Sequence, residues 1–377
     1  MRQYRCWAEI DLDALRENLA WIRHRVGPNV KIMTVVKADA YGHGLKQIAA
    51  LLMQSGTDVF GVANLAEAQA IRSVGRGWPI LMLGACLPFE AETAVREDVM
   101  ATVSTYDEAR RFSEAASRLG RPADIHIKVD TGMGRLGATP HEVLDLWKRL
   151  EGLPGLRIRG FYTHFASAED DPSFTRAQKL RFRRLLAKAP HQSLDYLHAN
   201  NSAALLFEQD THLNTVRPGL LVYGILPEGN RRIRSELQHQ VRPALSWKCR
   251  VSLVKEITRG TALSYGRSFV APRPMRVATL TAGYGDGYLR AGSNRARVLI
   301  GGEYCRVLGR ITMDQTIIDV SRLPQVQSGD EAVLIGRQGS RQITVNQLAG
   351  WCRTIPWEIL TAITARVPRI YTGSQAS

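Results

Sequence analysis

The stretch from Lys31 to Gly44 reads KIMTVVKADAYGHG, and in it a strand pattern is followed directly by a lysine and a turn rich in small residues. Residues 32–36 are mostly apolar and have the length of a strand, and Lys37 follows them directly. A continuous apolar run predicts a strand buried on both faces, as in a parallel sheet. A lysine at the end of such a strand is costly unless its amine is paired, reaches solvent or takes part in chemistry. For an isolated lysine, an amine in solvent is the simpler interpretation.

Further strand patterns follow this one, separated by amphipathic stretches such as Leu65–Val74, Tyr106–Leu119, His141–Leu150 and Ser173–Ala187. The expected strands are Lys31–Ala38, Asp58–Asn64, Pro79–Gly84, Met100–Thr105, Asp124–Asp130, Arg157–His164, Ser193–Ala199 and Thr215–Gly224. This alternation is typical of an α/β fold and predicts a (β/α)8 TIM barrel. A doubly wound open sheet is the alternative. The barrel is favoured because polar residues fall at or just past the carboxyl ends of strands, where barrel enzymes place their sites: Lys37, Lys128, Arg135, His164, His198 and Arg217.

The pattern changes after a polar, charged stretch from Leu226 to about Arg242, which reads as a linker. The strands expected beyond it are Trp247–Ile257, Arg276–Leu280, Ala296–Ile300, Arg306–Leu308, Thr316–Val320 and Glu331–Ile335. They are joined by turns rather than helices, which predicts a mostly antiparallel β domain. We therefore expect three parts: an N-terminal strand in 1–10 that pairs with the C-terminal domain, a barrel in 11–235, and a β-rich C-terminal domain in 236–377.

Composition narrows the class of protein. The chain of 377 residues is 45% hydrophobic and 23% charged, as in an ordinary globular protein. Its formal net charge of +15 could indicate a protein that binds nucleic acid. The basic residues form no long cluster, however, so we expect no nucleic-acid partner. The five cysteines show no close-pair spacing, which argues against a metal site or a disulfide framework. No apolar run has the length of a signal or membrane segment, which predicts a cytoplasmic protein.

Two loops near the end of the expected barrel have the character of a phosphate site. Barrel enzymes often bind phosphate at the loops after strands seven and eight, beside a helix N-terminus. Asn201 and Ser202 follow the seventh strand and open a helix, and Gly219 follows the eighth strand, where it permits close backbone approach. A simple helix N-cap at Asn201 or Ser202 is the alternative, and both roles can coexist at one position.

From these residues outward, the whole chain resembles the alanine racemase family, a group of fold type III enzymes that use pyridoxal 5′-phosphate (PLP). The two longest matching motifs are Val36–Gly44 (VKADAYGHG) and Lys128–Gly137 (KVDTGMGRLG), and both are highly specific. The shorter matches follow in family order: Thr163–Ala166, Asn201–Ala203, Arg217–Gly219, Ser264–Arg267 and Met313–Gln315.

The resemblance implies a role for each matching residue. Lys37 would carry PLP covalently, and His164 would pack against the pyridine ring. Arg217 would face the pyridine nitrogen with His198 behind it. Arg135 would approach the phenolic oxygen of PLP and the substrate carboxylate. Phosphate would be held by Tyr41, Ser202, Gly219 and Leu220, with Asn201 beside them, and Met313 and Tyr284 would border the substrate pocket, with Asp314 supporting it.

Racemisation needs two acid/base groups on opposite faces of the substrate, and the resemblance assigns them to Lys37 and Tyr265. An unperturbed tyrosine has a pKa of about 10, so Tyr265 needs cationic neighbours to act as a base near neutral pH. A guanidinium can only donate hydrogen bonds, so Arg217 would leave the pyridine nitrogen unprotonated and favour racemisation over transamination. For Lys128, a carbamylated side chain and an unmodified amine paired with an acid remain equally open.

Two positions depart from the family pattern. Relatives usually carry tyrosine where this chain has Trp357, and often cysteine where it has Thr312. An indole has one N–H donor and no acceptor, so Trp357 could donate to phosphate but could not accept a hydrogen bond from Tyr265. We expect looser restraint of Tyr265 and an altered pH–rate profile; the alternative is that Trp357 only packs. Thr312 supports no inference on specificity.

The resemblance also implies a homodimer with shared sites, because Tyr265 and Met313 lie in the expected second domain and Lys37 in the barrel. The substrate would be alanine, with D-alanine made for the cell wall or L-alanine degraded. A serine or broad-specificity racemase is the nearest alternative. A PLP decarboxylase is disfavoured by Arg217, and a non-catalytic PLP-binding protein by the second domain.

Overall fold

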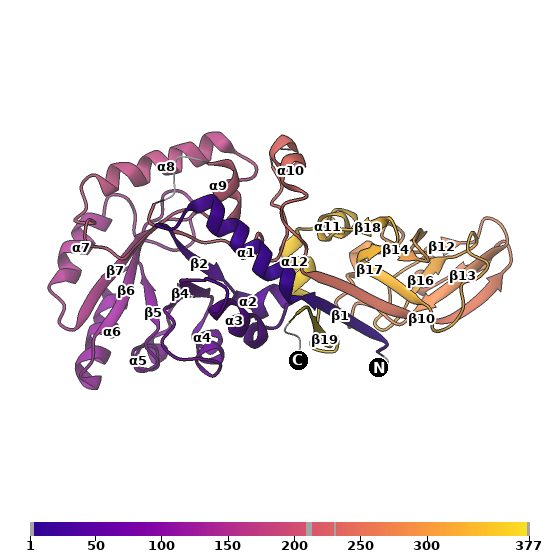
Figure 1. The fold of residues 1–377 in the computed structure, drawn as a ribbon, viewed down its shortest axis with the longest axis horizontal. Helices are drawn as coiled ribbons and strands as arrows, with labels where there is room; N and C mark the ends of the chain where they lie inside the picture. Colours follow the sequence, from indigo (N-terminus) through magenta and orange to yellow (C-terminus); the bar gives the residue numbers. More distant parts are fainter. Residues whose placement is uncertain (1–3, 209–212, 230, 375–377) are drawn as a thin grey trace. The chain divides into compact units, whose positions relative to one another are not determined.

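The computed structural model describes residues 4–208, 213–229 and 231–374, so the ends of the expected first and last domains lie outside the described residues (Figure 1). Contacts between Cα atoms divide the chain into two compact units. The barrel unit comprises residues 14–40 and 45–242. The β-rich unit comprises the described residues of 1–13, 41–44 and 243–377. The short segment 41–44 thus groups with the β-rich unit, although the sequence places it beside the first barrel strand.

Eight parallel strands close into a barrel, in chain order, and the last of them pairs with the first. They are β2 (Lys31–Val35), β3 (Val59–Val62), β4 (Ile80–Ala85), β5 (Met100–Val103), β6 (Ala123–Lys128), β7 (Leu156–Tyr162), β8 (Tyr196–His198) and β9 (Thr215–Val216). Closure is made by β2 against β9, with Ile32 opposite Val216. The TIM barrel predicted from the sequence is therefore confirmed, and the open-sheet alternative is wrong.

Helices follow the barrel strands, and α6 shows why these sequences become helical. Thr105 accepts a hydrogen bond from the Glu108 amide while the Glu108 side chain caps the Thr105 amide, so the first turn is closed reciprocally. Phe112 is buried on the inner face, and Gly120 ends the helix in the left-handed region. The other helices of this part of the chain are α1 (Leu12–Val26), α3 (Leu45–Met53), α4 (Leu65–Arg72), α5 (Ala91–Arg96), α7 (Val143–Glu151), α8 (Pro172–Leu186), α9 (Ser202–Phe207) and α10 (Arg231–Leu237).

The β-rich unit is built around β10 (Leu245–Ile257), which pairs with β1 (Cys6–Asp11), β13 (Met275–Leu280) and β17 (Glu331–Gln338). Alternate residues of β10 are buried, which is the pattern of a strand with one face on a core. The pairing of β1 with β19 is parallel, and the other pairings of this sheet are antiparallel. The remaining elements are β11 (Ala262–Leu263), β12 (Phe269–Val270), β14 (Arg297–Ile300), β15 (Glu303–Arg306), β16 (Thr316–Asp319), β18 (Arg341–Ile343), β19 (Arg369–Thr372), α11 (Val345–Cys352) and α12 (Pro356–Thr361).

Three local expectations differ from the structure. The eighth barrel strand, expected at Thr215–Gly224, spans only Thr215–Val216. The stretch expected to be a linker contains helix α10. The strand expected at Arg306–Leu308 instead runs from Glu303 to Arg306, because Gly301 and Gly302 form the hairpin turn, both with positive φ. Two consecutive glycines in this conformation suit a two-residue turn, which sets Ile300 opposite Glu303 and moves the strand toward the turn. Within the described ranges, no helix is long and apolar enough to cross a membrane.

Candidate active site

Lys37 lies just beyond β2, at the start of a helical turn of unusual hand. This turn, α2 (Lys37–Gly42), has φ angles between 52° and 55° at four successive non-glycine residues, Ala38 to Tyr41. A left-handed turn of L-residues costs about 1–2 kcal/mol per residue, so its surroundings must hold it. The Ala38 amide donates to Glu67 Oε1 at 2.7 Å, and the Leu45 amide donates to Asp39 Oδ1 at 2.7 Å. The turn therefore fixes the direction in which the chain leaves Lys37.

The Lys37 amine is half-buried among positive charges. Burial lowers its pKa, the nearby Arg135 guanidinium lowers it further, and Glu67 opposes the change. A lower pKa increases the fraction of neutral amine near neutral pH, which is the form that acts as a nucleophile or a base. The position at the carboxyl end of a barrel strand and this electrostatic setting both suit chemistry at Lys37.

Arg217, just beyond β9, is buried, and its guanidinium is held on several sides. Its Nη2 donates to the Thr163 and Ala199 carbonyl oxygens, each at 2.9 Å, and approaches His164 Nδ1 at 3.0 Å. Its Nη1 lies 2.6 Å from His198 Nδ1. Burial lowers the pKa of the guanidinium to about 10, so it remains a cation near neutral pH.

A chain of imidazoles continues from this arginine. His198 Nε2 lies 3.0 Å from His126 Nδ1, and both side chains are buried. Because Arg217 can only donate, His198 Nδ1 must accept, so His198 carries its proton on Nε2 and donates it to His126 Nδ1. His126 then carries its own proton on Nε2, which has no hydrogen-bond partner among the described residues. The sequence reasoning identified His198 but missed His126.

Aromatic rings and a glycine fix these imidazoles in place. The Tyr162 ring stacks on His198 with ring centroids 4.4 Å apart, and the Tyr196 ring stacks on His126 at 5.1 Å. A Cβ atom at Gly160 would overlap the His126 ring, so this position of β7 is open only to glycine. Burial and the Arg159 and Arg217 charges lower the pKa of His126 to about 3, which keeps it neutral.

Lys128, at the end of β6, adds a further buried amine. Its Nζ lies 5.5 Å from the centroid of the Tyr162 ring. Burial, together with Arg217 and Arg135, lowers the pKa of Lys128 to about 8, although Asp130 opposes this. Within the described part of the chain, no carboxylate forms an ion pair within 4.0 Å of the cations Lys37, Lys128, Arg135 and Arg217.

The loop that carries Arg135 is shaped by its own sequence. The Asp130 carboxylate accepts hydrogen bonds from the amides of Gly132, Met133 and Gly134 at 2.7–2.9 Å. A Cβ atom at Gly137 would come within 2.6 Å of the Asp130 amide nitrogen, so the loop closes only with glycine there. Arg135 is exposed at the end of this fold. The motif that the sequence singled out thus builds a rigid support for one arginine.

The two loops expected to hold phosphate come together in the structure. The Gly219 amide donates to Ser202 Oγ at 2.9 Å, and the Leu221 amide approaches the same oxygen at 3.4 Å. Leu220, between them, is buried. Asn201 is the N-cap of α9, since its side chain accepts from the Ala204 amide at 3.0 Å. Asn201 therefore does have the capping role considered from the sequence, whereas Ser202 lies directly against the second loop.

Tyr41 and Trp357 meet within the β-rich unit. The Trp357 side chain forms a hydrogen bond with the Tyr41 side chain, and because an indole only donates, the tyrosine hydroxyl is the acceptor. Burial raises the pKa of Tyr41 to about 12, and this hydrogen bond partly offsets the rise. Trp357 therefore does more than pack. It is a hydrogen-bond donor to a residue expected at the phosphate.

The remaining expected residues lie on loops of the β-rich unit. Tyr265 is 71% exposed, in a short turn whose flanking Ser264 has a φ of 62° and donates from Oγ to the Arg310 carbonyl at 2.5 Å. The loops that carry Tyr284 and Met313 are joined, because the Tyr284 amide donates to the Thr312 carbonyl at 2.9 Å. Asp314 forms an ion pair with Arg366 at 2.8 Å. The Thr312 hydroxyl donates to the Gln315 carbonyl, so this departure from the usual cysteine has a local structural role.

Known proteins agree with this arrangement over nearly the whole chain. The family model described as "Alanine racemase, N-terminal domain" matches residues 10–227, and that described as "Alanine racemase, C-terminal domain" matches residues 244–371. An alanine racemase of Methylacidiphilum infernorum is 42% identical over 370 residues, covering 97% of this chain and 92% of the relative. One of Halothermothrix orenii is 40% identical and covers 97% of this chain and 96% of the relative.

Solved structures give the same result. The alanine racemase from D-cycloserine-producing Streptomyces lavendulae superposes with a TM-score of 0.91 at 34% identity, over 99% of this chain and 98% of that one. The Bacillus anthracis alanine racemase with bound L-Ala-P gives a TM-score of 0.90 at 35% identity, over 99% of this chain and 96% of that one. On the strength of its fold, its sequence and both domain matches, this chain belongs to the alanine racemase family and is an amino-acid racemase.

Proposed function

We propose that this enzyme interconverts L-alanine and D-alanine with PLP as cofactor and with Lys37 and Tyr265 as its two acid/base groups. The observation that carries the proposal is the set of four cations in the barrel unit, Lys37, Lys128, Arg135 and Arg217, which have no ion-paired carboxylate among the described residues. Like charges gathered in a partly buried site repel one another, and an anionic ligand relieves that repulsion. PLP brings a phosphate and a phenolate, and an amino acid adds a carboxylate.

The residues present fit PLP. Lys37 offers a half-buried amine of lowered pKa for covalent attachment. Ser202 Oγ accepts hydrogen bonds from the amides of the Gly219 loop, so its own O–H remains to donate within a group that would bind the phosphate. Tyr41, with Trp357 behind it, and Leu220 would complete that group, and His164 would pack against the ring. When bound, PLP withdraws electrons from the α-carbon of an attached amino acid, so that its α-proton can be removed.

Arg217 determines which reactions such a site favours. A guanidinium held by two carbonyl oxygens and two imidazoles can donate to a ring nitrogen but cannot accept a proton from it. An acidic residue in this role would stabilise a protonated ring and a stronger electron sink. The arginine therefore favours racemisation over transamination or decarboxylation.

Tyr265 is the second acid/base group of the proposal. It lies in the β-rich unit and is largely exposed, as are its expected companions Met313 and Tyr284. We propose that the enzyme is a homodimer in which Tyr265, Met313 and Tyr284 of one chain complete the site around Lys37 of the other. The Asp314–Arg366 ion pair would hold the Met313 loop in this arrangement.

Lys128 is the proposed site of carbamylation. Only a neutral amine reacts with carbon dioxide, and a pKa of about 8 leaves a usable neutral fraction near neutral pH. The reaction would replace a cation between Arg217 and Arg135 by an anion. Protein equilibrated with ¹³C-bicarbonate should show a carbamate ¹³C resonance that is absent in Lys128→Ala. An unmodified amine in a high-resolution map would overturn this assignment.

The function is tested by a racemisation assay over a panel of L-amino acids, together with an absorption spectrum of the purified enzyme. Alanine should be the best substrate, and in heavy water its α-hydrogen should exchange. Lys37→Ala should abolish both the exchange and the absorption band of covalently attached PLP. A protein that binds PLP but does not exchange the α-hydrogen of alanine would contradict the proposal, and faster turnover of serine would reassign the substrate.

The shared site is tested by mixing two inactive variants. Each proposed site combines Lys37 of one chain with Tyr265 of the other. In a dimer of one Lys37→Ala chain and one Tyr265→Ala chain, both substitutions fall in the same site, and the other site is intact. Subunit exchange should therefore restore part of the activity. If differently tagged chains show that subunits have exchanged but no activity returns, the result would count against shared sites.

A further inference from the structure

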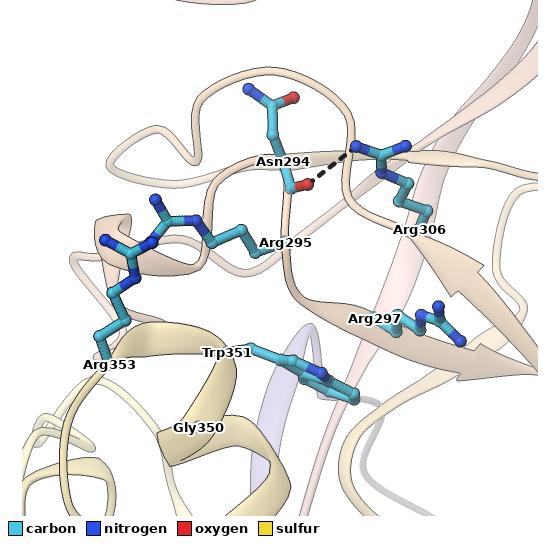
Figure 2. Close-up of a pocket in the computed structure, with 7 residues that line it drawn as sticks. All are labelled: Asn294, Arg295, Arg297, Arg306, Gly350, Trp351 and Arg353. Atoms are coloured by element: carbon cyan, nitrogen blue, oxygen red, sulfur yellow. Dashed lines mark hydrogen bonds between the residues drawn. The ribbon is translucent and has the colours of Figure 1, made fainter.

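A second cationic site lies wholly within the β-rich unit and involves none of the residues of the candidate active site. It is a pocket of about 410 Å³ between the β14–β15 hairpin, the turn before it and the end of α11 (Figure 2). Four arginines line it: Arg295, Arg297, Arg306 and Arg353. Its size falls in the range of pockets that bind small ligands.

The arrangement of two of these arginines is unfavourable without a ligand. Arg297 on β14 and Arg306 on β15 are direct cross-strand partners, so their side chains lie on the same face of the hairpin. Like charges opposite each other destabilise a strand pair. Within the described residues, neither arginine forms an ion pair with a carboxylate; Glu303, also on β15, pairs with Arg341 of β18 instead. Arg306 instead donates from Nη2 to the Asn294 carbonyl at 3.1 Å (Figure 2).

The other two arginines are also fixed by the backbone. Arg353 caps α11 in the left-handed region, with a φ of 58°, where glycine is the usual residue. Arg295 follows Asn294, which has a φ of 59°. In Figure 2 the side chains of Arg295 and Arg353 extend toward the same part of the pocket. The pocket is thus lined by four guanidinium groups, and a guanidinium suits bidentate contacts with phosphate oxygens.

Trp351 supplies an aromatic wall. It is half-buried, with one part packed on the core cluster of Leu299, Val333 and Ile343, and it also lines the pocket. A tryptophan ring beside guanidinium groups offers a stacking surface for a planar base.

From this geometry we propose that the arginine pocket binds a diphosphate group, either free or as part of a nucleoside diphosphate. The four guanidinium groups would contact the two phosphates, and Trp351 would receive a base where one is present. This site is independent of the alanine racemase reaction, so its existence does not depend on the function proposed above.

The test is calorimetric titration of the PLP-loaded enzyme with inorganic pyrophosphate at constant ionic strength. Loading with PLP fills the phosphate site of the barrel, so the remaining binding reports on other sites. The Arg297→Gln/Arg306→Gln double variant should lose at least tenfold in affinity. The control, Arg259→Gln/Arg273→Gln, removes the same charge from exposed positions of the same unit and should change affinity less than twofold. Equal losses in both variants, or no saturable binding at millimolar pyrophosphate, would overturn the proposal.

Thermal unfolding without ligand gives an independent check. Arg297→Gln removes the like-charge pair without breaking the hydrogen bond of Arg306 to Asn294, so its melting temperature should equal or exceed that of the parent, while the stabilisation by pyrophosphate is lost. A lower melting temperature would show that the arginines stabilise the fold and would contradict the proposal.

Titration with ADP, pyrophosphate and adenosine distinguishes a nucleoside diphosphate from free diphosphate. ADP binding more tightly than pyrophosphate, with the advantage lost in Trp351→Leu, identifies a nucleotide; equal affinities identify free diphosphate.

Discussion

Arg217 donates from Nη1 to Nδ1 of His198 across 2.6 Å, and this contact decides where the protons of two buried imidazoles lie. Because the guanidinium has no acceptor, every hydrogen bond in the chain from Arg217 through His198 to His126 must run outward from the arginine. Neutral His198 is thereby locked in one tautomer, and a protonated His198 would place an N–H against the guanidinium. This series of hydrogen bonds therefore holds the Arg217 guanidinium in one orientation and keeps both imidazoles uncharged.

His126→Leu tests this polarity. The substitution removes the acceptor of the His198 Nε2–H and leaves a buried donor unsatisfied, which costs about 1–3 kcal/mol. His126→Asn is the matched control, because its Oδ1 can occupy the place of Nδ1 and accept the same hydrogen bond. We expect the leucine variant to lose stability and to bind PLP more weakly, and the asparagine variant to recover most of both.

The tautomers themselves can be read from ¹⁵N chemical shifts in protein labelled at histidine. Both His198 and His126 should be protonated on Nε2 and unprotonated on Nδ1 in the parent enzyme. A spectrum with His198 protonated on Nδ1 would be incompatible with the donor chain, whatever the activity of the variants.

Buried neutral histidines also predict how stability depends on pH. The pKa values of His126, His164 and His198 are all lowered, in each case mainly by burial and next by nearby cations. Below a pH of about 6.5 the unfolded chain takes up protons at these positions and the folded chain does not. Stability should therefore fall as the pH drops below 6.5, by up to about 1.4 kcal/mol per pH unit for each histidine, and should be insensitive to them above it.

Denaturant unfolding between pH 5 and pH 8 measures this dependence. His126→Asn should make the acid limb shallower by about one proton, because one neutral imidazole is gone. An acid limb of unchanged slope would mean that His126 is protonated in the folded enzyme.

The architecture was largely predictable because its signals are local. The eight barrel strands follow from apolar runs of strand length, and α6 follows from its capping residues. The motifs that carry Lys37, Lys128 and Arg217 lie at or just past the ends of these strands, so their positions also follow from the strand pattern. The position of His126, two residues before Lys128 and therefore on the same side of β6, was a signal available in the sequence and not used.

Other features were not predictable from local patterns. Nothing in Ala38-Asp39-Ala40-Tyr41 signals a left-handed turn, since glycine is absent from it and the turn is held by distant groups such as Glu67. The hydrogen bond of Trp357 to Tyr41 joins residues far apart in the chain, so the sequence could show the departure from the family pattern but not its partner. The Gly301-Gly302 hairpin was a local signal that should have set the register of β15.

Ala38→Gly tests the left-handed turn. In a right-handed helix this substitution costs about 1 kcal/mol, whereas at a φ of 52° glycine removes a strain of about 1–2 kcal/mol. After the greater flexibility of the unfolded chain is subtracted, we expect a net gain of about 0.5 kcal/mol. The control is Ala50→Gly in the ordinary helix α3, which should lose about 1 kcal/mol. The opposite signs are measured by denaturant unfolding, and a loss in both variants would mean that Ala38 is not strained.

Trp357 tests how the phosphate side of the site is held. Trp357→Phe removes the donor to the Tyr41 hydroxyl, and since that hydrogen bond lowers the pKa of Tyr41, the pKa should rise further. Loss of a hydrogen bond of about 1 kcal/mol predicts roughly five-fold weaker PLP binding, measured by the return of the absorption band on titration of the apoenzyme. Trp357→Tyr restores a hydroxyl that can both donate and accept, so it should retain PLP affinity. It should also shift the pH–rate profile if the new acceptor restrains Tyr265. An unchanged kcat, KM and pH–rate profile in Trp357→Tyr would show that the indole affects Tyr41 alone.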